Sequence, residues 1–564
     1  MGYASGEFSW KEYLKEKNID GFYLPSFDNY LSEYVPKEDS LRIYLTQFTG
    51  SVAEALVTSD GMINLYVDGR YHEQADLECD LNRIRVVKVP FGQSIGSALG
   101  ADLKKLKTVG FLPFRTPEKL RQDYNSLEWS SLNEEEFHSL IGFSAPQFSG
   151  DLWEVPYEKE GEHLLKKWQR ALKDGEGAFL SGLDAVAWAS GLRSNSLPYQ
   201  GTFRALALLT NKKIQLFVDP SMLEKVQAHA TAVREVYPLS DFNEEIKNFV
   251  VDTLWWDPGF STAAQVDLLK SADQLKGKLK EKNFHSEWMS YKSEPEKEAF
   301  RTSFEKSNQA IYDTFCALIE RVRVGEKISE VAFRDSLEKR YQELGARTQS
   351  FRTIAGFGAH GSIIHYGTPK ESTYCEEGDL VLCDSGAIYE EGFATDCTRT
   401  VLALGAPNEK QRTQYTLVLK GLLQVLMARF KEGIEGNELD KLARAGLKEK
   451  GMDFAHGTGH GVGVNVHEGG YSIRPESVTP MKAHRVGSIE PGFYEPGVGG
   501  IRLENIAIVQ RDEHSEELYF EDLVTIGFWL PLVERTLLSE AENKFLDDYE
   551  ARCLEKGRSF AHLF

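Results

Sequence analysis

The chain has 564 residues, which is too many for a single hydrophobic core and predicts about three or four domains. Its 41% hydrophobic and 27% charged residues are typical of a globular protein, and no run of about eighteen apolar residues predicts a membrane helix. The 86 acidic and 65 basic residues give a formal net charge of -21, which argues against nucleic acid as a partner.

Cysteine usage and the first residues of the chain predict its compartment. The six cysteines are scattered without CxxC spacing. The opening MGYASGEFSW lacks the basic start and apolar core of a secretion signal. Both features predict a reducing, cytoplasmic location.

A hairpin pattern occurs twice in the first half of the chain. ALVTSDGMINLYVDG at 55–69 and ALLTNKKIQLFVDP at 207–220 each join an apolar strand, a polar turn, an alternating strand and a Val-Asp pair. Hairpins of this kind are common, so the pattern alone leaves a chance similarity open. Because each copy also follows a stretch with helical character, we predict two related α/β domains in tandem.

Two stretches rich in proline, glycine and charge indicate domain boundaries. APQFSGDLWEVPYEKEGE covers the region near 150–155, and HSEWMSYKSEPEKEAF leads into a helix predicted at 297–323. The predicted domains are therefore 1–152, 153–292 and 293–564.

Two glycine-rich motifs in the last domain have alternative interpretations. GFGAHG at 356–361 fits G-x-G-x-x-G, but the following SIIHYGTP predicts a strand instead of the helix that a dinucleotide site requires. HGTGH spaces His456 and His460 as in the helical zinc motif, but it lacks the glutamate beside the first histidine. Its glycines predict a loop or strand.

Two aspartates lie on a predicted hairpin. DLVLCDSGAIY places Asp384 in an apolar, buried strand, and Asp396 follows the polar turn Glu390–Gly392. A single aspartate here could cap a turn or lie on a solvated face. Two carboxylates buried without a counterion would cost several kcal/mol each, which favours a bound cation between them.

The same reasoning applies to two later glutamates. Glu490 ends a strand in SIEPGFYE, and Glu504 interrupts the apolar strand GIRLENIAIV. With His460 and the two aspartates they form an oxygen-rich donor set that suits two divalent ions.

These motifs resemble a known family. DSGAIY followed by TDCTRT, HGTGHGVG, EPGFYE and GIRLEN resemble the pita-bread metallopeptidases, and among them the Xaa-Pro aminopeptidases. YLPSFDNYLSEYVP, FTGS and DGRY resemble the first domain of the long, three-domain form, and GLRSNSLPYQGTF with LFVD resembles its middle domain. The resemblance implies an α/β (α+β) fold with two tandem creatinase-N-like domains followed by a pita-bread catalytic domain.

The resemblance also implies roles for individual residues. Glu490 is the proton shuttle as well as a ligand, His467 and His365 stabilise the oxyanion, and His456 with Arg502 lines the proline side. One such histidine alone is more often a core residue, but three family positions match here. The family usually holds two Mn²⁺ ions, and the donor set also admits Co²⁺, Zn²⁺ or Fe²⁺. The implied metal ligands are Asp384, Asp396, His460, Glu490 and Glu504.

The implied function is hydrolysis of the N-terminal Xaa-Pro bond of peptides with proline at the second position, by a water or hydroxide bridging two metals. A prolidase (Xaa-Pro dipeptidase) is the alternative, and a non-catalytic pita-bread binding protein is a further one. The resemblance also implies a homodimer through the catalytic domain, and we expect exposed aromatic residues at Phe528 and Trp529.

The chain departs from the family at the hairpin. Asp384 and Asp396 are twelve positions apart (396 − 384), one more than usual in the family. Because strand side chains alternate between faces, an extra residue within a strand would turn one carboxylate away. We therefore predict that it lies in the Glu390–Gly392 turn or in a bulge beside it, with both carboxylates facing the same metal pair.

Overall fold

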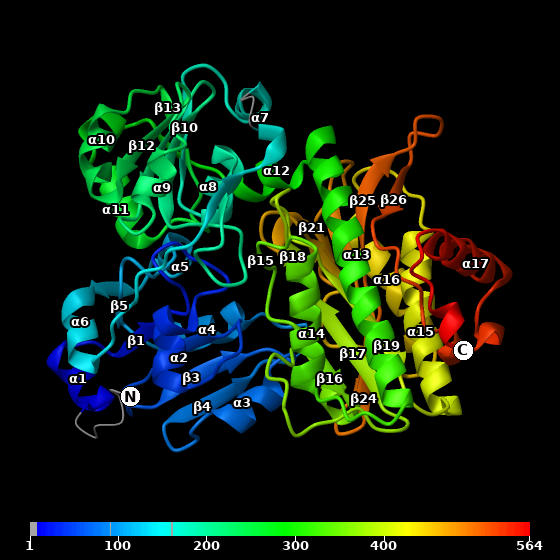
Figure 1. The fold of residues 1–564 in the computed structure, drawn as a ribbon. Helices are drawn as coiled ribbons and strands as arrows, with labels where there is room; N and C mark the ends of the chain where they lie inside the picture. Colours follow the sequence, from blue (N-terminus) through cyan, green and yellow to red (C-terminus); the bar gives the residue numbers. More distant parts are fainter. Residues whose placement is uncertain (1–7, 91, 159–161) are drawn as a thin grey trace. The chain divides into compact units, whose positions relative to one another are not determined.

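The computed structural model describes residues 8–90, 92–158 and 162–564, which belong to two compact units (Figure 1). Unit 1 comprises Met1–Glu154, Glu158–Pro198 and Thr202–His285, and unit 2 comprises Val155–Tyr157, Tyr199–Gly201 and Ser286–Phe564.

Unit 1 contains two six-stranded sheets with the same topology. The first has the order β4 (Ile84–Lys88), β3 (Ile63–Val67), β2 (Glu54–Val57), β1 (Gly21–Leu24), β5 (Thr108–Phe111) and β6 (Glu128–Ser131). The second has the order β12 (Arg234–Pro238), β11 (Ile214–Val218), β10 (Ala205–Thr210), β8 (Glu176–Leu180), β13 (Thr253–Trp256) and β14 (Leu279–Glu281). In each sheet the second and third pairings in this order are antiparallel and the other three are parallel. The predicted tandem repeat is thus confirmed.

Local sequence accounts for the first hairpin. Gly61 has a φ of +85° in the turn between β2 and β3, a conformation that glycine adopts without steric cost. The apolar strand residues then bury against the helices of this unit. These are α1 (Trp10–Glu16), α2 (Leu41–Thr46), α3 (His72–Glu78), α4 (Ile95–Leu103), α5 (Glu118–Asp123), α6 (Glu134–Ile141), α7 (Glu162–Ala171), α8 (Leu183–Ser190), α9 (Leu223–Gln227), α10 (Phe242–Asn248) and α11 (Ala263–Ser271). A short pair, β7 (Leu152–Glu154) and β9 (Leu192–Ser194), completes the unit's strands within the described residues.

Unit 2 is built from small antiparallel sheets. One has the order β16 (Ile354–Phe357), β17 (Leu380–Ser385) and β19 (Cys397–Leu402). Another has the order β21 (Glu468–Ile473), β20 (Gly459–Gly461), β22 (Val486–Ile489), β25 (Asn505–Arg511) and β26 (Leu518–Asp522). Two-stranded pairs join β15 (Thr348–Gln349) to β18 (Ala387–Ile388) and β23 (Gly492–Glu495) to β24 (Gly499–Arg502).

Helices surround these strands (Figure 1). They are α13 (Glu294–Arg323), α14 (Glu330–Glu343), α15 (Glu409–Leu426), α16 (Gly436–Lys448) and α17 (Glu540–Glu555), preceded by α12 (His285–Ser290). The predicted helix at 297–323 begins earlier, at Glu294, because Ser293 and Glu296 form a capping box there.

Three local predictions are wrong. Residues 362–369 form a turn and an irregular segment instead of a strand. Glu504 lies between β24 and β25 instead of inside one strand. Phe528 and Trp529 are buried rather than exposed, with Phe528 stacked on Tyr549.

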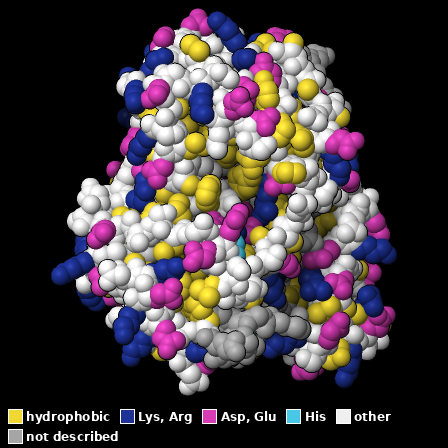
Figure 2. Space-filling view, turned by 90° about the vertical axis from the view of Figure 1, so that its left-hand side faces the viewer, with side chains coloured by type: hydrophobic (Ala, Val, Ile, Leu, Met, Phe, Trp, Pro, Cys, Tyr) yellow, Lys and Arg dark blue, Asp and Glu magenta, His cyan; other side chains and the backbone are white. Residues whose placement is uncertain are grey.

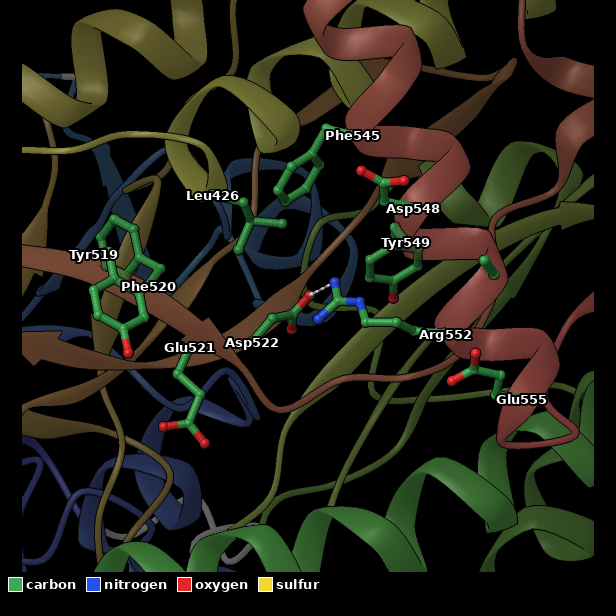
Figure 3. A pocket seen from close by; sticks show the side chains of 11 residues that line it. Leu426, Tyr519, Phe520, Glu521, Asp522, Phe545, Asp548, Tyr549, Arg552 and Glu555 are labelled. Carbon is green, nitrogen blue, oxygen red and sulfur yellow. Dashed lines mark ion pairs between the residues drawn. The ribbon is translucent and has the colours of Figure 1, made fainter. Parts of the chain in front are cut away.

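The surface carries charges of both signs. On the face in Figure 2, Asp and Glu side chains are interspersed with Lys and Arg. Among the described residues, no helix is long and apolar enough to cross a membrane. In unit 2, a cavity of about 540 Å³ lies between β26 and α17, where Arg552 faces Asp522 (Figure 3).

Candidate metal centre

The β17–β19 hairpin brings both aspartates to one face. Asp384 lies opposite Thr398 in a regular register, and Asp396 precedes Thr398 by two residues. Because strand side chains alternate, all three point to the same side. Tyr389 and Gly392 close the turn, where Gly392 has a φ of +76°. The expectation that both carboxylates face one site agrees with this register.

The opposite face of the hairpin carries two thiols. Cys383 and Cys397 are buried there, and the Cys397 thiol lies 3.6 Å from the Glu504 carbonyl oxygen. Burial raises the pKa of Cys397 to about 12 and that of Cys383 well above its usual value. In the absence of metal both thiols therefore stay protonated at neutral pH, on the face away from the two aspartates.

His460 on β20 presents one ring nitrogen to the carboxylates. Its Nδ1 lies 3.0 Å from the Gly461 carbonyl oxygen, which can only accept a hydrogen bond, so Nδ1 carries the proton. Nε2 is then the unprotonated nitrogen, 3.6 Å from Asp396 Oδ2 and 3.5 Å from Glu490 Oε1. A ring fixed in this tautomer by its second nitrogen is ready to bind a metal.

The two glutamates approach the same point from neighbouring strands. Glu490 directly follows β22 and accepts a hydrogen bond from Ser488 Oγ at 3.3 Å. Glu504 Oε2 accepts one from Thr398 Oγ1 at 2.8 Å. Ligand atoms of Asp396, His460 and Glu504 all lie within 4.8 Å of one another, a spacing that one metal ion could bridge.

Several carboxylate oxygens of the candidate ligands have no hydrogen-bond partner within the described part of the chain. Asp384 Oδ1, Asp396 Oδ1 and Glu504 Oε1 are buried and have no hydrogen-bond partner there. Buried polar atoms are normally satisfied, so this arrangement fits a cation-binding site. Four carboxylates and one imidazole form a donor set of the kind that divalent ions prefer.

Electrostatics lead to the same conclusion. Burial and then the charges of Glu504, Asp384 and Glu490 raise the pKa of Asp396 well above its usual range. Burial and the charges of Glu490 and Asp384 do the same for the pKa of Glu504. Burial also raises the pKa of Glu490 to about 7, although Arg502 opposes the effect. A divalent cation would reverse these shifts by stabilising the ionised forms.

The ligand set is open on one side. The Asp396 side chain is 6% exposed, whereas those of Glu490 and His460 are 18% and 23% exposed. Solvent therefore reaches the candidate ligand set from the Glu490 and His460 side.

Arg502 connects several members of the site. Its Nη2 donates to Asp384 Oδ2 at 2.6 Å, its Nη1 to the Tyr494 hydroxyl at 2.7 Å, and its Nε to Thr398 Oγ1 at 3.1 Å. One guanidinium thus fixes a candidate ligand, a strand residue and an aromatic side chain.

His456 joins the same network. Its Nδ1 lies 2.7 Å from the Gly457 carbonyl oxygen and its Nε2 lies 2.9 Å from the Tyr494 hydroxyl. With Nδ1 protonated, Nε2 accepts a hydrogen bond from the Tyr494 hydroxyl. The Tyr494 oxygen in turn accepts a hydrogen bond from Arg502. The phenol is held from both sides.

The remaining two candidate histidines lie beside the site in different ways. The His467 ring meets the His460 ring edge to face, with centroids 4.3 Å apart. His365 follows Ile364, whose carbonyl oxygen accepts from Arg502 Nη1 at 3.3 Å. The structure thus packs His467 directly on a candidate ligand and places His365 next to a residue that contacts Arg502.

Motif reasoning missed two residues that contact candidate ligands. Thr398 supports Glu504, and Ser488 Oγ contacts both Glu490 Oε1 and the His460 backbone N–H, the latter at 3.0 Å. Each lies two positions from a ligand along the chain, Thr398 from Asp396 and Ser488 from Glu490. Strand alternation could therefore have found both.

Comparisons with known proteins show the family of this chain. Residues 302–511 match the model of metallopeptidase family M24, and residues 9–135 and 147–296 each match the creatinase/prolidase N-terminal domain. A probable Xaa-Pro aminopeptidase P from Botryotinia fuckeliana is 32% identical over 98% of this chain and 89% of its own length. The chain belongs to the Xaa-Pro aminopeptidase P family.

Solved structures agree with this membership. X-prolyl aminopeptidase from Caenorhabditis elegans, described as a cytosolic enzyme with a di-nuclear active site, has a TM-score of 0.83 at 27% identity and covers 95% of this chain and 92% of its own. Prolidase from Pyrococcus horikoshii has a TM-score of 0.52 at 25% identity and covers 64% of this chain and 98% of its own. The predicted fold, two creatinase-N-like domains and a pita-bread domain, is confirmed, and all five candidate ligands lie within the M24 match.

Proposed function

We propose that this chain is an aminopeptidase that removes the residue before proline from the N-terminus of peptides, with two divalent metal ions at the candidate centre. The observation that carries the proposal is the set of buried carboxylate oxygens without partners among the described residues. They lie in a chain that matches relatives named Xaa-Pro aminopeptidase P over almost its full length.

The residues that would hold the metals are Asp384, Asp396, His460, Glu490 and Glu504. When bound, two such ions supply Lewis acidity and lower the pKa of water. We expect Mn²⁺ because of the family resemblance, and the oxygen-rich donor set is also compatible with Co²⁺, Zn²⁺ and Fe²⁺.

The side chains on the open side would move the protons. The Glu490 side chain is 18% exposed, more than those of Asp384 at 12% and Asp396 at 6%, so its carboxylate would take the proton of the attacking water and deliver it to the proline nitrogen. His467 and His365 would stabilise the oxyanion. His456, Arg502 and the Tyr494 ring would line the proline side.

A prolidase is the alternative function. The Pyrococcus horikoshii prolidase covers only 64% of this chain, whereas the aminopeptidase P relative covers 98% of it. That difference in extent favours the aminopeptidase.

Three finer statements belong to the same proposal. We propose the domain division 1–152, 153–292 and 293–564, a cytoplasmic location, and a homodimer through the catalytic domain. The location is supported by the neighbour described as cytosolic. The homodimer rests on family resemblance, since Phe528 and Trp529 are buried within the chain.

The test compares substrates and metal content. Arg-Pro-Pro, a Xaa-Pro dipeptide and a matching Xaa-Ala peptide are offered to chelated protein with and without Mn²⁺. We expect cleavage of Arg-Pro-Pro only with metal, and a rate for the Xaa-Ala peptide that is lower by orders of magnitude. Full activity in verified metal-free protein, or preference for the dipeptide, would contradict the proposal.

A further inference from the structure

Lys292 is a buried cation outside the candidate ligand set. Its side chain is 1% exposed, and the residue lies between α12 and α13 along the chain. The ammonium forms an ion pair with the Glu468 carboxylate and donates to the Met289 carbonyl oxygen at 2.6 Å. The free energy lost when two charges leave water offsets much of the attraction between them. A buried ion pair therefore adds little net stability, and stability by itself does not explain this one.

Glu468 lies next to two of the site histidines. Glu468 directly follows His467 in the chain. On β21 it lies opposite Gly461 of β20, the residue after His460. Its carboxylate, 5% exposed, rests against Gly463, where an added Cβ would come within 1.7 Å of Glu468 Oε2. Any displacement of this carboxylate therefore acts on the turn that joins His460 to His467.

Lys292 also contacts the segment that leads to Asp396. Its ammonium lies 5.9 Å from the Phe393 ring centroid and 6.0 Å from that of Phe300, within cation–π range. The two rings stack with centroids 4.3 Å apart. The backbone N–H of Ala394, the residue after Phe393, donates to the Gly463 carbonyl oxygen at 2.9 Å. The Asp396 segment and the histidine segment thus meet at this lysine.

We propose that Lys292 is a positioning residue which, through Glu468 and Phe393, holds the histidine segment and the Asp396 segment in register at the metal centre. This inference rests on the proposed function for its catalytic consequence, but its effect on metal binding does not require peptidase activity.

The test uses charge-neutral replacements. Lys292→Met alone removes the positive charge beside the buried Glu468 carboxylate and could prevent folding, so the decisive variant is the double replacement Lys292→Met/Glu468→Gln. Lys297→Met is the matched control. Lys297 lies on α13 with a 2% exposed side chain, but its ammonium contacts Glu294, His484 and Gln510.

Mn²⁺ affinity is measured by titration calorimetry on the full-length chain, and kcat and KM are measured with a Xaa-Pro peptide. We expect the double variant to keep its circular dichroism spectrum and to bind Mn²⁺ about 10- to 100-fold more weakly, the range for residues that orient metal ligands. At saturating Mn²⁺ we expect a lower kcat with little change in KM. The control should match the wild type.

Wild-type Mn²⁺ affinity in the double variant, or an equal loss in Lys297→Met, would overturn the inference. Failure of the proposed function gives a different result, namely no cleavage of Xaa-Pro peptides by the wild-type chain at any Mn²⁺ concentration.

Discussion

Asp396 shows at the level of one residue how a candidate binding site opposes stability. Without metal, its carboxylate is buried among like charges. At pH 8 we expect Asp396→Asn to raise the free energy of unfolding of the metal-free protein by about 1–2 kcal/mol, because the amide carries no charge. The same change should weaken Mn²⁺ binding by more than about 100-fold.

Chemical denaturation with EDTA and with Mn²⁺ measures both effects. A variant less stable than the wild type in EDTA, or one with unimpaired Mn²⁺ binding, would show that Asp396 is not a ligand.

Glu54 provides a second prediction at this scale, in unit 1. It accepts a hydrogen bond from the Tyr23 hydroxyl at 2.8 Å, and burial raises its pKa from 4.5 to about 7. Between these values the unfolded chain loses the proton that the folded chain retains. The contribution of Glu54 to stability is therefore complete below pH 4.5 and is lost as the pH rises to about 7.

Glu54→Gln removes this dependence. Relative to the wild type, the variant should gain up to about 3 kcal/mol between pH 4.5 and pH 7, from a shift of about 2.5 pKa units. Urea unfolding of both proteins at pH 5 and pH 8 measures the difference. An equal stability difference at both pH values would refute the assignment.

At the scale of elements, the close packing of β20 on β22 leads to a prediction. An added Cβ at Gly459 would lie 2.0 Å from the Ser488 carbonyl oxygen on β22, whereas one at Gly457 would meet nothing closer than 3.5 Å. Gly459→Ala should therefore push β20 away from β22, move His460, lower the free energy of unfolding by about 2 kcal/mol and weaken Mn²⁺ binding.

Gly457→Ala is the control from the same motif. It should leave metal affinity and unfolding within about 0.5 kcal/mol of the wild type. If both alanines behave alike, close packing of β20 on β22 does not position His460.

The elements also show where sequence reasoning succeeded and where it failed. The hairpins were predictable because turn residues such as Gly61 and alternating strands are local signals. The candidate ligands could be singled out because a carboxylate in a buried strand stands out against its apolar neighbours. Residues 362–369 were predicted as a strand because an apolar loop and an apolar strand share the same local pattern.

A distant residue decides that last case. Glu330 on α14 is fully buried and accepts hydrogen bonds from the Tyr366 hydroxyl at 2.9 Å and from the Lys370 backbone N–H at 3.0 Å. These contacts hold the loop in its irregular path. No local pattern encodes a partner that lies 36 residues away in the chain.

For the whole molecule, we expect the thermal unfolding of the two units to respond differently to metal. All candidate ligands lie in unit 2, while unit 1 has its own hydrophobic cores. With Mn²⁺ at about 100 times its dissociation constant, unit 2 should gain about 2.7 kcal/mol. In scanning calorimetry we expect the unit 2 transition to move upward with Mn²⁺ while the transition that Glu54→Gln shifts stays in place. A metal-dependent shift confined to the Glu54-sensitive transition would contradict this placement of the ligands.

The thiols behind the β17–β19 hairpin have a consequence for the motions of the centre. Cys383 and Cys397 are buried, so a reagent in solution reaches their thiols only when the hairpin opens locally. The raised pKa of each also keeps its thiol protonated at neutral pH. A cation bound between Asp384 and Asp396 would link the two strands on the other face and make such opening rarer. Oxidative damage to these sulfurs would then become slower whenever the centre is loaded, so that metal supply also sets the chemical lifetime of the chain.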